Sequence, residues 1–393
     1  MTDRTVSARV FIRPGELQAT EELRLTEVRE DLVRVRLRAS GVCHSDLHVA
    51  AGEWTADGPL VLGHEGAGVV EAAGPGVRDV RPGDHVILSW FAPCRRCEQC
   101  ARGRAWLCSG TKALDNVLPD GTTSFFRRDG TPVRAFLGLG TFAEATVVPE
   151  SAAVRIPEDI PFPVAALIGC AVTTGVGAVT NTACVRPGDT AVVLGCGGVG
   201  QAILLGLSLV GADTIIAVDL SEERLALSRT LGATHVLRGN DPNLAGHVRA
   251  ITGGGAEHAF EAIGSPTTIE LLPQLVGRGG QAVVVGMPAE GVRVVFDPFD
   301  LADGGKRILG CNYGSSVPSV DFPRLARLYA SGRLALDCLV GQTITLDAVD
   351  EALEDLRRAV GLRTVITQTT STHMSEHKPL PGHRMGEQRF TGM

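Results

Sequence analysis

The sequence predicts an α/β protein that combines an irregular, mostly β domain with a doubly wound parallel sheet. Its 393 residues, 44% of them hydrophobic and 21% charged, are enough for two domains with complete cores. Between residues 32 and 148, short β-branched runs alternate with glycine-rich turns, as in irregular β structure. From residue 190 onward, strand-like runs alternate with helical stretches of about ten to fifteen residues, which is the pattern of a parallel, doubly wound sheet.

The expected elements follow the chain in that order. In the first part, strands are expected within residues 31–39, 66–76, 83–88 and 142–148. In the second part, residues 190–220 should form a strand, a loop, a helix and a strand, followed by a helix at 221–233 and strands at 235–237, 281–286 and 307–311. After about residue 315 the pattern predicts helices at 320–332 and 346–360 and a last strand at 363–367. The polar residues 371–393 are expected to be disordered.

Charge and composition exclude several classes of protein. With 37 basic and 44 acidic side chains the formal charge is −7, which argues against a nucleic-acid partner. The first eighteen residues are interrupted by charges and do not form a secretory signal, and the apolar region 190–220 is broken by glycines and Asp213. We therefore expect a cytoplasmic protein without a membrane partner. Its ten cysteines then indicate metal binding, redox chemistry or packing rather than disulfides.

Four cysteines are spaced as the ligands of one metal ion. They are Cys94, Cys97, Cys100 and Cys108. Thiolates two residues apart on a tight loop can point at one centre, and a fourth from just downstream closes a tetrahedron that suits zinc. Such a site has no open position, so its role would be structural. The alternative is a loop with four reduced cysteines.

A glycine-rich turn predicts a dinucleotide site. It follows the strand-like run AVVL, opens a helix, and consists of Gly195, Cys196, Gly197, Gly198, Val199 and Gly200. The glycines allow backbone amides to approach a pyrophosphate at the helix N-terminus, and Asp219 ends the next strand, where a carboxylate can bind the adenosine ribose. Asp219 would repel a 2′-phosphate, so NAD is favoured over NADP, although Arg224 leaves some room for NADP. A glycine-rich loop without a ligand is the alternative.

Three separated segments each supply one further metal ligand. Cys43, His64 and Cys170 together would make a zinc site with three protein ligands and an open position, as catalytic zinc requires. Each of them alone would more often be a packing residue.

These motifs together resemble the zinc-dependent alcohol dehydrogenases of the medium-chain dehydrogenase/reductase superfamily, in the class I and class III branch. The resemblance extends from about residue 32 to 366 through GVCHSD, GHEGAG, the four-cysteine loop, GC, the glycine turn and RTVI. It implies a GroES-like catalytic domain at residues 1–172 and 315–370 and a Rossmann NAD-binding domain at 173–314. It also implies a homodimer or homotetramer.

The resemblance assigns roles to single residues. Cys43, His64 and Cys170 would bind catalytic zinc and the four loop cysteines structural zinc, which makes two zinc ions per chain. Asp46 would orient His64, and Glu65 would lie behind the metal. The remaining roles are the proton relay for Ser45 and His48, contacts to the phosphates or adenosine ribose for His44, Arg224 and Arg363, and contact to the nicotinamide for Thr174.

The implied reaction is hydride transfer between NAD and a primary alcohol or aldehyde. Zinc would acidify the alcohol, and Ser45 would pass its proton through the nicotinamide ribose to His48. We expect an aromatic or long aliphatic substrate, with Trp54, Trp90 and Phe142 as pocket walls. Each of the three could equally be a core residue, since Trp and Phe are usually buried.

The sequence leaves three alternative functions open. Residues 113–138 look like the longer loop of the class I and class III alcohol dehydrogenase branch. That branch includes the thiol-dependent formaldehyde dehydrogenases, which bind a glutathione or mycothiol adduct through charged side chains. The candidates here are Glu53, Asp57 and Lys112, but Lys112 stands where the glutathione-dependent enzymes carry an arginine. A non-catalytic dinucleotide-binding protein and a zinc-free reductase are less favoured, because both would lack the zinc ligands.

Overall fold

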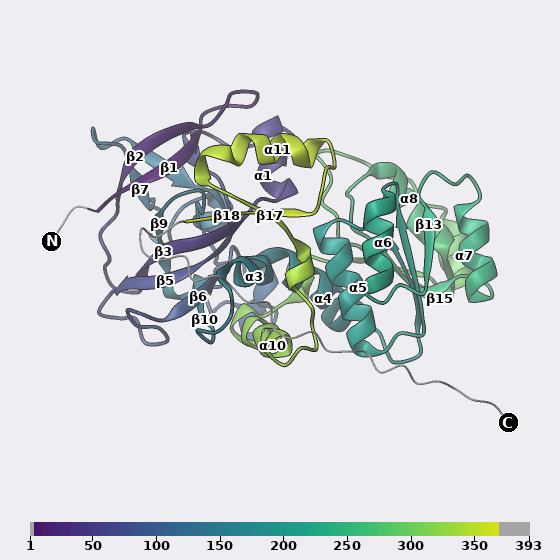
Figure 1. Cartoon of the computed structure of the whole chain (residues 1–393). Helices are drawn as coiled ribbons and strands as arrows, with labels where there is room; N and C mark the ends of the chain where they lie inside the picture. Colours follow the sequence, from purple (N-terminus) through teal and green to yellow (C-terminus); the bar gives the residue numbers. More distant parts are fainter. Residues whose placement is uncertain (1–3, 369–393) are drawn as a thin grey trace.

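The computed structural model describes residues 4–368, so the expected disorder of residues 371–393 lies outside the described residues. A β-rich lobe, formed largely by the N-terminal part of the chain, lies beside a lobe built on a parallel sheet (Figure 1). The last segment of the chain returns to the β-rich lobe, where helix α11 (Val349–Arg357) packs against α1 (His44–Ala51). The predicted combination of a mostly β part and a doubly wound parallel sheet is confirmed.

The β-rich lobe contains a small closed barrel and a seven-stranded sheet. The barrel strands, in spatial order, are β1 (Thr5–Phe11), β2 (Ala19–Leu25), β7 (Phe125–Phe126), β8 (Pro132–Ala135) and β4 (Leu60–Val61). The sheet runs β10 (Ala153–Arg155), β6 (His85–Leu88), β5 (Glu65–Ala73), β3 (Leu32–Gly41), β18 (Arg363–Thr367) and β17 (Val340–Ile344), and β9 (Ala145–Pro149) also pairs with β3.

Strand β3 places two parts of the site next to each other. Its alternation of buried Val33, Val35 and Leu37 with more exposed arginines is typical of a strand that covers a core with one face. It pairs antiparallel with β5, so that Gly41 lies opposite Glu65, and with β18, so that Gly41 also lies opposite Val365. The start of α1, the GHE segment and strand β18 therefore meet at the same end of this sheet.

The second lobe has a six-stranded parallel sheet in the order β13-β12-β11-β14-β15-β16. In chain order its strands are β11 (Thr190–Leu194), β12 (Thr214–Asp219), β13 (His235–Arg238), β14 (Ala256–Glu261), β15 (Val276–Val284) and β16 (Arg307–Gly310). The helices between them are α5 (Gly198–Val210), α6 (Glu222–Thr230), α7 (Leu244–Thr252), α8 (Pro266–Leu275) and α9 (Pro298–Gly304). The strand order reverses between β11 and β14, and ligands of such sheets bind in the crevice at this point.

A long apolar helix joins the two lobes. Residues 162–183 are continuously helical, with α3 (Phe162–Leu167), a π-helical segment at 168–172, α4 (Thr173–Gly177) and a second π-helical segment at 178–183. Within the described residues this is the one helix with the length and composition of a membrane span, but 83% of its most apolar window is buried inside the protein. It is therefore a core helix, and the expected cytoplasmic location stays a prediction.

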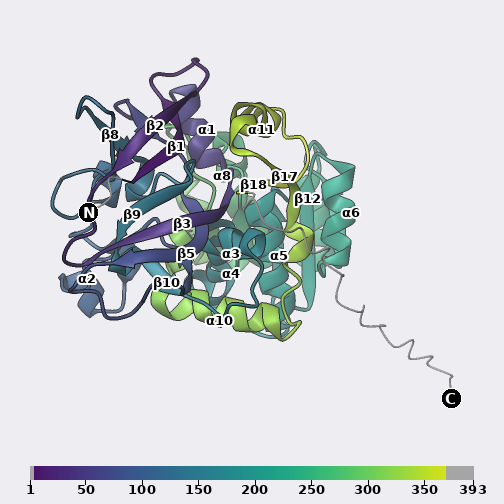
Figure 2. The same ribbon diagram turned by 60° about the vertical axis from the view of Figure 1, so that its left-hand side comes forward.

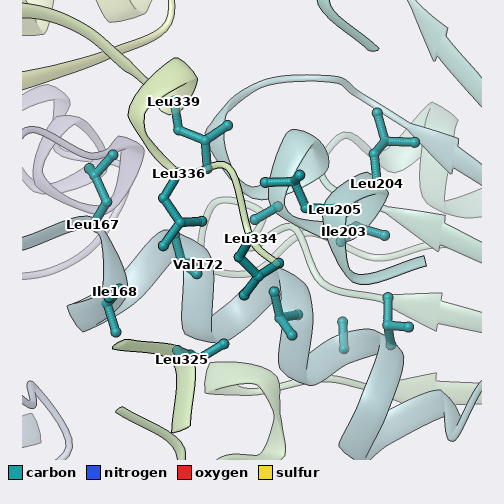
Figure 3. Packing of buried hydrophobic residues seen from close by; sticks show 14 of the residues in the cluster. Leu167, Ile168, Val172, Ile203, Leu204, Leu205, Leu325, Leu334, Leu336 and Leu339 are labelled. Atoms are coloured by element: carbon teal, nitrogen blue, oxygen red, sulfur yellow. The ribbon is translucent and has the colours of Figure 1, made fainter. Parts of the chain in front are cut away.

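The main hydrophobic core lies around this helix and is shared between the lobes. Leu167, Ile168 and Val172 of the helix belong to one cluster with Ile203, Leu204 and Leu205 of α5 and Leu325 of α10 (Pro318–Ala330), part of which Figure 3 shows. Leu334, Leu336 and Leu339 complete this part of the core from the segment that follows α10. In the second view, α3, α4 and α5 lie between the β3–β5 sheet and the parallel-sheet strands (Figure 2). The expected domain boundary after residue 172 falls within the helix and stays a prediction.

The remaining helices are short. They are α2 (Glu98–Ala101) in the four-cysteine loop and 3₁₀ turns at residues 105–107, 113–115, 136–138, 150–152, 313–315, 337–339 and 346–348. The predictions for strands β11, β12, β13, β15 and β16, for helices α5 and α6 and for the two C-terminal helices are confirmed. Strand β14, helices α7, α8 and α9 and the helix 162–183 have no counterpart among the predicted elements.

Candidate active site and metal clusters

Four buried side chains gather between the lobes as candidate metal ligands. The ligand atoms of Cys43, His64, Glu65 and Cys170 all lie within 4.8 Å of one another. Cys43 is the N-cap of α1, directly after β3, and Cys170 lies in the first π-helical segment of the core helix. Such segments are frequent at functional sites. The structure thus brings together the three residues expected to hold catalytic zinc, together with the expected acidic neighbour.

Asp46 fixes the orientation of His64. Its carboxylate is fully buried and accepts hydrogen bonds from the backbone amides of Cys43, at 3.1 Å, and Gly63, at 2.9 Å. It also lies 3.2 Å from Nδ1 of His64. Because an ionised carboxylate only accepts hydrogen bonds, Nδ1 carries the proton and Nε2 is left as the ring nitrogen for a metal. This is the position predicted for Asp46.

The electrostatics of this cluster fit a divalent cation. Neither carboxylate oxygen of Glu65 has a hydrogen-bond partner among the described residues, although Nη2 of Arg363 lies 3.3 Å from Oε1. Burial raises the pKa of Glu65 to about 8, and Arg363 only partly opposes this. The thiol of Cys170 donates a hydrogen bond to Cys43, which lowers the pKa of Cys43 well below its usual value. Cys43, His64 and Glu65 offer a soft thiolate, a free imidazole nitrogen and an unpartnered carboxylate. With the sulfur of Cys170 they form a donor set that suits zinc.

A glycine makes room for the Glu65 carboxylate. A Cβ atom at Gly41 would lie 1.9 Å from Oε2 of Glu65. Any other residue at this position would push the carboxylate away from the cluster. The register of β3 against β5 matters for the same reason, because it places a glycine opposite Glu65.

Ser45 and His48 lie on α1 beyond the ligand Cys43. The Ser45 hydroxyl lies 3.9 Å from the Cys43 sulfur, and His48 is one turn further along the helix. Nδ1 of His48 contacts Oε2 of Glu53, and its ring stacks on Trp54 with 4.6 Å between ring centroids. Both residues line the large cavity described below, as a proton relay requires.

The second cluster consists of the four loop cysteines. The sulfurs of Cys94, Cys97, Cys100 and Cys108 lie within 4.8 Å of one another, as their spacing predicted. Backbone amides point at the sulfurs: Cys97 N donates to Cys94 at 3.3 Å, and Cys94 N donates to Cys108 at 3.2 Å. Hydrogen bonds, of which the one from the backbone amide of Cys100 has the largest effect, lower the pKa of Cys97 to about 5. Amides that stabilise thiolates prepare a site for zinc.

We expect Cys97→Ser to lose one zinc ion per chain and to lower the melting temperature by several degrees. The loop contributes few apolar residues to the core, so metal binding supplies much of its folding free energy. Metal analysis and thermal unfolding measure both quantities, and Cys338→Ser, outside both clusters, serves as the control. An unchanged melting temperature with two zinc ions would contradict the structural role.

The glycine turn lies at the switch point of the parallel sheet, between β11 and the N-terminus of α5. A Cβ at Gly200 would lie 1.8 Å from the carbonyl oxygen of Gly195, whereas nothing lies within 4 Å of a Cβ at Gly197. The turn is therefore tight on its inner side and open on the side where a pyrophosphate would approach. The buried Gln201 side chain holds the turn by donating to Cys196 O and Arg224 O, both at 3.0 Å.

Asp219 and the expected cofactor contacts surround this turn. The carboxylate of Asp219 accepts the amide of Cys196 at 2.7 Å and that of Ser221 at 2.8 Å, which holds it at the mouth of the turn. His44 and Thr174 line the same cavity. Val199 also lines it.

The two expected arginines already have partners. Arg224 donates to the carbonyls of Ala359 and Gly361, at 2.9 and 3.1 Å. Arg363 is buried, donates to Val42 O at 3.0 Å and lies against the first residue of α5. Both line the cavity, so their contact with a cofactor stays a prediction.

One cavity of about 1010 Å³ joins these features. It is lined at one end by Cys43, His64 and Cys170 and at the other by the glycine turn and Asp219. The expected walls Trp54 and Trp90 line it.

The expectation for Phe142 is wrong. Its side chain is fully buried in the core of the barrel, and Phe136 lines the cavity instead, with its ring edge toward His64 at 5.6 Å between centroids. Phe142 lies in the bend before β9, and its neighbour Ala143 bridges Ala8 of the barrel strand β1, so the large side chain packs into the barrel core.

The charged candidates for thiol binding are not grouped at this cavity. Lys112 pairs with Asp115 and lines a separate hollow beside the four-cysteine loop. The exposed Asp57 pairs with Arg134. Glu53 contacts His48.

Sequence reasoning missed three residues that shape the site. They are Gln201, Phe136 and Ile263, whose side chain packs against Gly195. A buried glutamine inside an apolar helix is a signal that could have identified the first. The other two have no local signal, because their position depends on how distant segments come together.

Comparison with known proteins agrees with this geometry. Residues 29–158 match the family model of the alcohol dehydrogenase GroES-like domain, and residues 198–331 match that of the zinc-binding dehydrogenases. S-(hydroxymethyl)glutathione dehydrogenase of Paracoccus denitrificans is 35% identical over 91% of this chain and 98% of its own length.

Solved structures are similar over nearly the whole chain. Benzyl alcohol dehydrogenase of Acinetobacter calcoaceticus is 34% identical, with a TM-score of 0.86 over 93% of this chain and all of that one. An alcohol dehydrogenase zinc-binding domain protein of Burkholderia ambifaria is 35% identical, with a TM-score of 0.90 over 94% of this chain and all of that one. The chain therefore belongs to the zinc-dependent alcohol dehydrogenases of the medium-chain dehydrogenase/reductase superfamily and is an NAD-dependent zinc oxidoreductase.

Proposed function

We propose that this enzyme transfers a hydride between NAD and a primary alcohol or aldehyde with an aromatic or long aliphatic side chain. The observation that carries this proposal is the single cavity that connects the Cys43, His64 and Cys170 cluster with the glycine turn and has apolar walls between them. A substrate carbon at the first end and a nicotinamide reaching in from the second can meet there, which hydride transfer requires.

The cofactors would bind where the donor sets fit them. Cys43, His64 and Cys170 would hold zinc, which would supply a Lewis acid for the substrate oxygen, and the glycine turn would hold NAD, which would supply the hydride acceptor. The Ser45 hydroxyl accepts the substrate proton, and His48 is the group from which this proton passes to solvent. Asp46 keeps Nε2 of His64 directed at the cluster.

Apolar side chains close the substrate end. Trp54 stacks on His48, and Phe136 covers His64. Trp90 lies against Tyr313, whose hydroxyl donates to Gly169 O at 2.6 Å beside Cys170. These walls exclude water and provide flat surface for an aromatic or long alkyl group.

The charges of the cavity favour such an alcohol over a glutathione adduct. A glutathione adduct carries carboxylates that need cationic partners. Among the described residues, the lysines and arginines that line the cavity are Arg224 and Arg363. Arg224 lies near the nucleotide end and donates to backbone carbonyls, whereas Arg363 lies between the first residue of α5 and Glu65, with which it is paired. Glu290 adds a carboxylate to the lining.

Steady-state NADH formation tests this choice. We expect benzyl alcohol and linear primary alcohols to be oxidised with higher kcat/KM than formaldehyde mixed with glutathione or mycothiol. A preference for formaldehyde that depends on either thiol would overturn the substrate assignment and favour the thiol-dependent alternative.

The cofactor preference gives a second prediction. Wild-type enzyme should prefer NAD to NADP by at least about 10²-fold in kcat/KM, because a 2′-phosphate beside Asp219 places like charges together at a cost of several kcal/mol. Asp219→Gly should narrow this ratio. Asp219→Asn removes the charge but keeps a side chain that can accept the amides of Cys196 and Ser221. It therefore separates the repulsion of a 2′-phosphate from the loss of these two hydrogen bonds. Equal use of both cofactors by the wild type would count decisively against the prediction.

The assembly gives a third prediction. Strand β16 ends the parallel sheet and presents unpaired backbone groups, and the preceding segment exposes Val295 and Phe299, with 79% and 76% of their surface accessible. An edge of this kind invites pairing with a second copy. We expect a homodimer or homotetramer at micromolar concentration by light scattering, and a monomeric mass would contradict it.

A further inference from the structure

The loop after α1 turns back onto His48. Gly52 ends the helix in the left-handed region, with φ of 77°, which lets the chain reverse. The amides of Glu53 and Trp54 then donate to the carbonyl of His48, at 2.8 and 3.2 Å. As a result, the carboxylate of Glu53 reaches Nδ1 of the imidazole while the indole of Trp54 covers its face, with 20° between the ring planes.

These contacts decide which nitrogen of His48 takes part in proton transfer. A carboxylate can only accept a hydrogen bond, so Nδ1 carries the proton that points at Glu53. The neutral imidazole then presents Nε2 as its acceptor. The stacking on Trp54 restricts rotation of the ring, so the acceptor is held in one direction at the wall of the cavity.

The same loop is attached to the other lobe by three hydrogen bonds. The indole nitrogen of Trp54 donates to Pro288 O at 3.0 Å, and the hydroxyl of Thr55 donates to Oε2 of Glu290 at 2.9 Å. The amide of Glu290 donates to Glu53 O at 3.2 Å. Pro288 and Glu290 follow β15 of the parallel sheet, so these three hydrogen bonds connect the two lobes. We call them the clasp.

We propose that Glu53 is a positioning residue of the proton relay, and that the clasp holds it against His48 while the two lobes are together. Its carboxylate keeps the imidazole in the tautomer and orientation that accept the substrate proton from the direction of Ser45. This inference rests on the proposed alcohol oxidation and adds to it a residue that acts through His48. Without the three hydrogen bonds of the clasp, the loop would lose its attachment and the relay its fixed geometry.

The contact contributes little to the stability of the fold, which makes it testable. The Glu53 side chain is 49% exposed, and ion pairs of exposed side chains typically contribute little to folding. Glu53→Ala should therefore fold, keep two zinc ions and bind NADH with unchanged affinity in a fluorescence titration. These measurements do not depend on turnover.

The experiment compares single-turnover rates of NADH formation from a primary alcohol, so that product release does not mask the chemical step. Glu53→Ala should be slower by about tenfold or more, the scale on which a hydrogen-bonding partner acts on the ring that it orients. Added imidazole, a small base that reaches the solvent end of the relay, should restore most of this loss. Glu53→Asp should recover part of the rate, and Thr55→Val, which removes one bond of the clasp, should show a smaller loss that imidazole also restores. Glu158→Gln, an exposed glutamate in the turn after β10, is the matched control.

The outcomes separate this inference from the proposed function. A wild type that forms no NADH from any primary alcohol overturns the function, and the inference with it. An active wild type whose Glu53→Ala variant keeps its full rate overturns the inference alone. So does a loss that imidazole does not restore, because it would show that Glu53 acts on the fold rather than on His48.

Discussion

Replacing Cys43 with serine is expected to reduce zinc from two ions to one per chain and to lower kcat/KM for alcohol oxidation by more than about 10³-fold. The hydroxyl is a much poorer ligand for zinc than a thiolate, and the variant would lose the thiolate that the hydrogen bond from Cys170 stabilises. A Lewis acid at the reacting oxygen supplies several kcal/mol of transition-state stabilisation, and each 1.4 kcal/mol corresponds to a factor of ten in rate. Metal analysis together with steady-state NADH formation measures both effects.

Cys184→Ser is the matched control for this variant. Cys184 is exposed and outside both metal clusters, so its replacement should keep two zinc ions and wild-type kinetics. A Cys43→Ser variant with two zinc ions and undiminished kcat/KM would remove Cys43 from the catalytic site.

Ser45→Ala is expected to slow alcohol oxidation by about 10²- to 10⁴-fold, the usual contribution of a positioned acid or base. The variant removes one hydroxyl 3.9 Å from the Cys43 sulfur and no candidate ligand, so zinc content and NADH binding should stay unchanged. Rates from benzyl alcohol and its deuterated form would show whether hydride transfer limits the measured rate.

Ser45→Thr keeps the hydroxyl and should retain most of the activity. If Ser45→Ala retained wild-type kcat while a deuterium isotope effect showed that chemistry is rate-limiting, the relay assignment would fail. The zinc assignment would survive that result, because the three ligands do not depend on Ser45.

The parts of the site that could be predicted are those whose residues are close together in the sequence. The four loop cysteines and the glycine turn are such local patterns, because the spacing itself determines which atoms can converge. The position of Asp219 could be predicted from the order of strand, helix and strand, because it is the last residue of the second strand. The convergence of Cys43, His64 and Cys170 needed the resemblance to a known family, since no short-range pattern connects three segments so far apart.

The parts that could not be predicted depend on tertiary contacts. Phe142 and Phe136 are close in the chain and similar in character, yet one fills the barrel core and the other lines the cavity. Lys112 pairs with Asp115, three residues away, and lines the hollow beside the four-cysteine loop instead of the large cavity. The contact between Glu53 and His48 arises only because Gly52 reverses the chain, and the sequence has no sign of which side chain the reversal brings to the imidazole.

The apolar helix at residues 162–183 determines how this enzyme can be recombined with its relatives. It carries Cys170 for the metal cluster while its buried side chains share one core with α5 of the parallel-sheet lobe. A chimera that exchanges the lobe from residue 190 onward would place foreign leucines of α5 against this helix and leave the core with holes or clashes. Splice points that preserve stability must therefore move the helix, α5 and the segment with Leu334 and Leu336 together. Substrate pockets cannot be exchanged between such enzymes as independent modules.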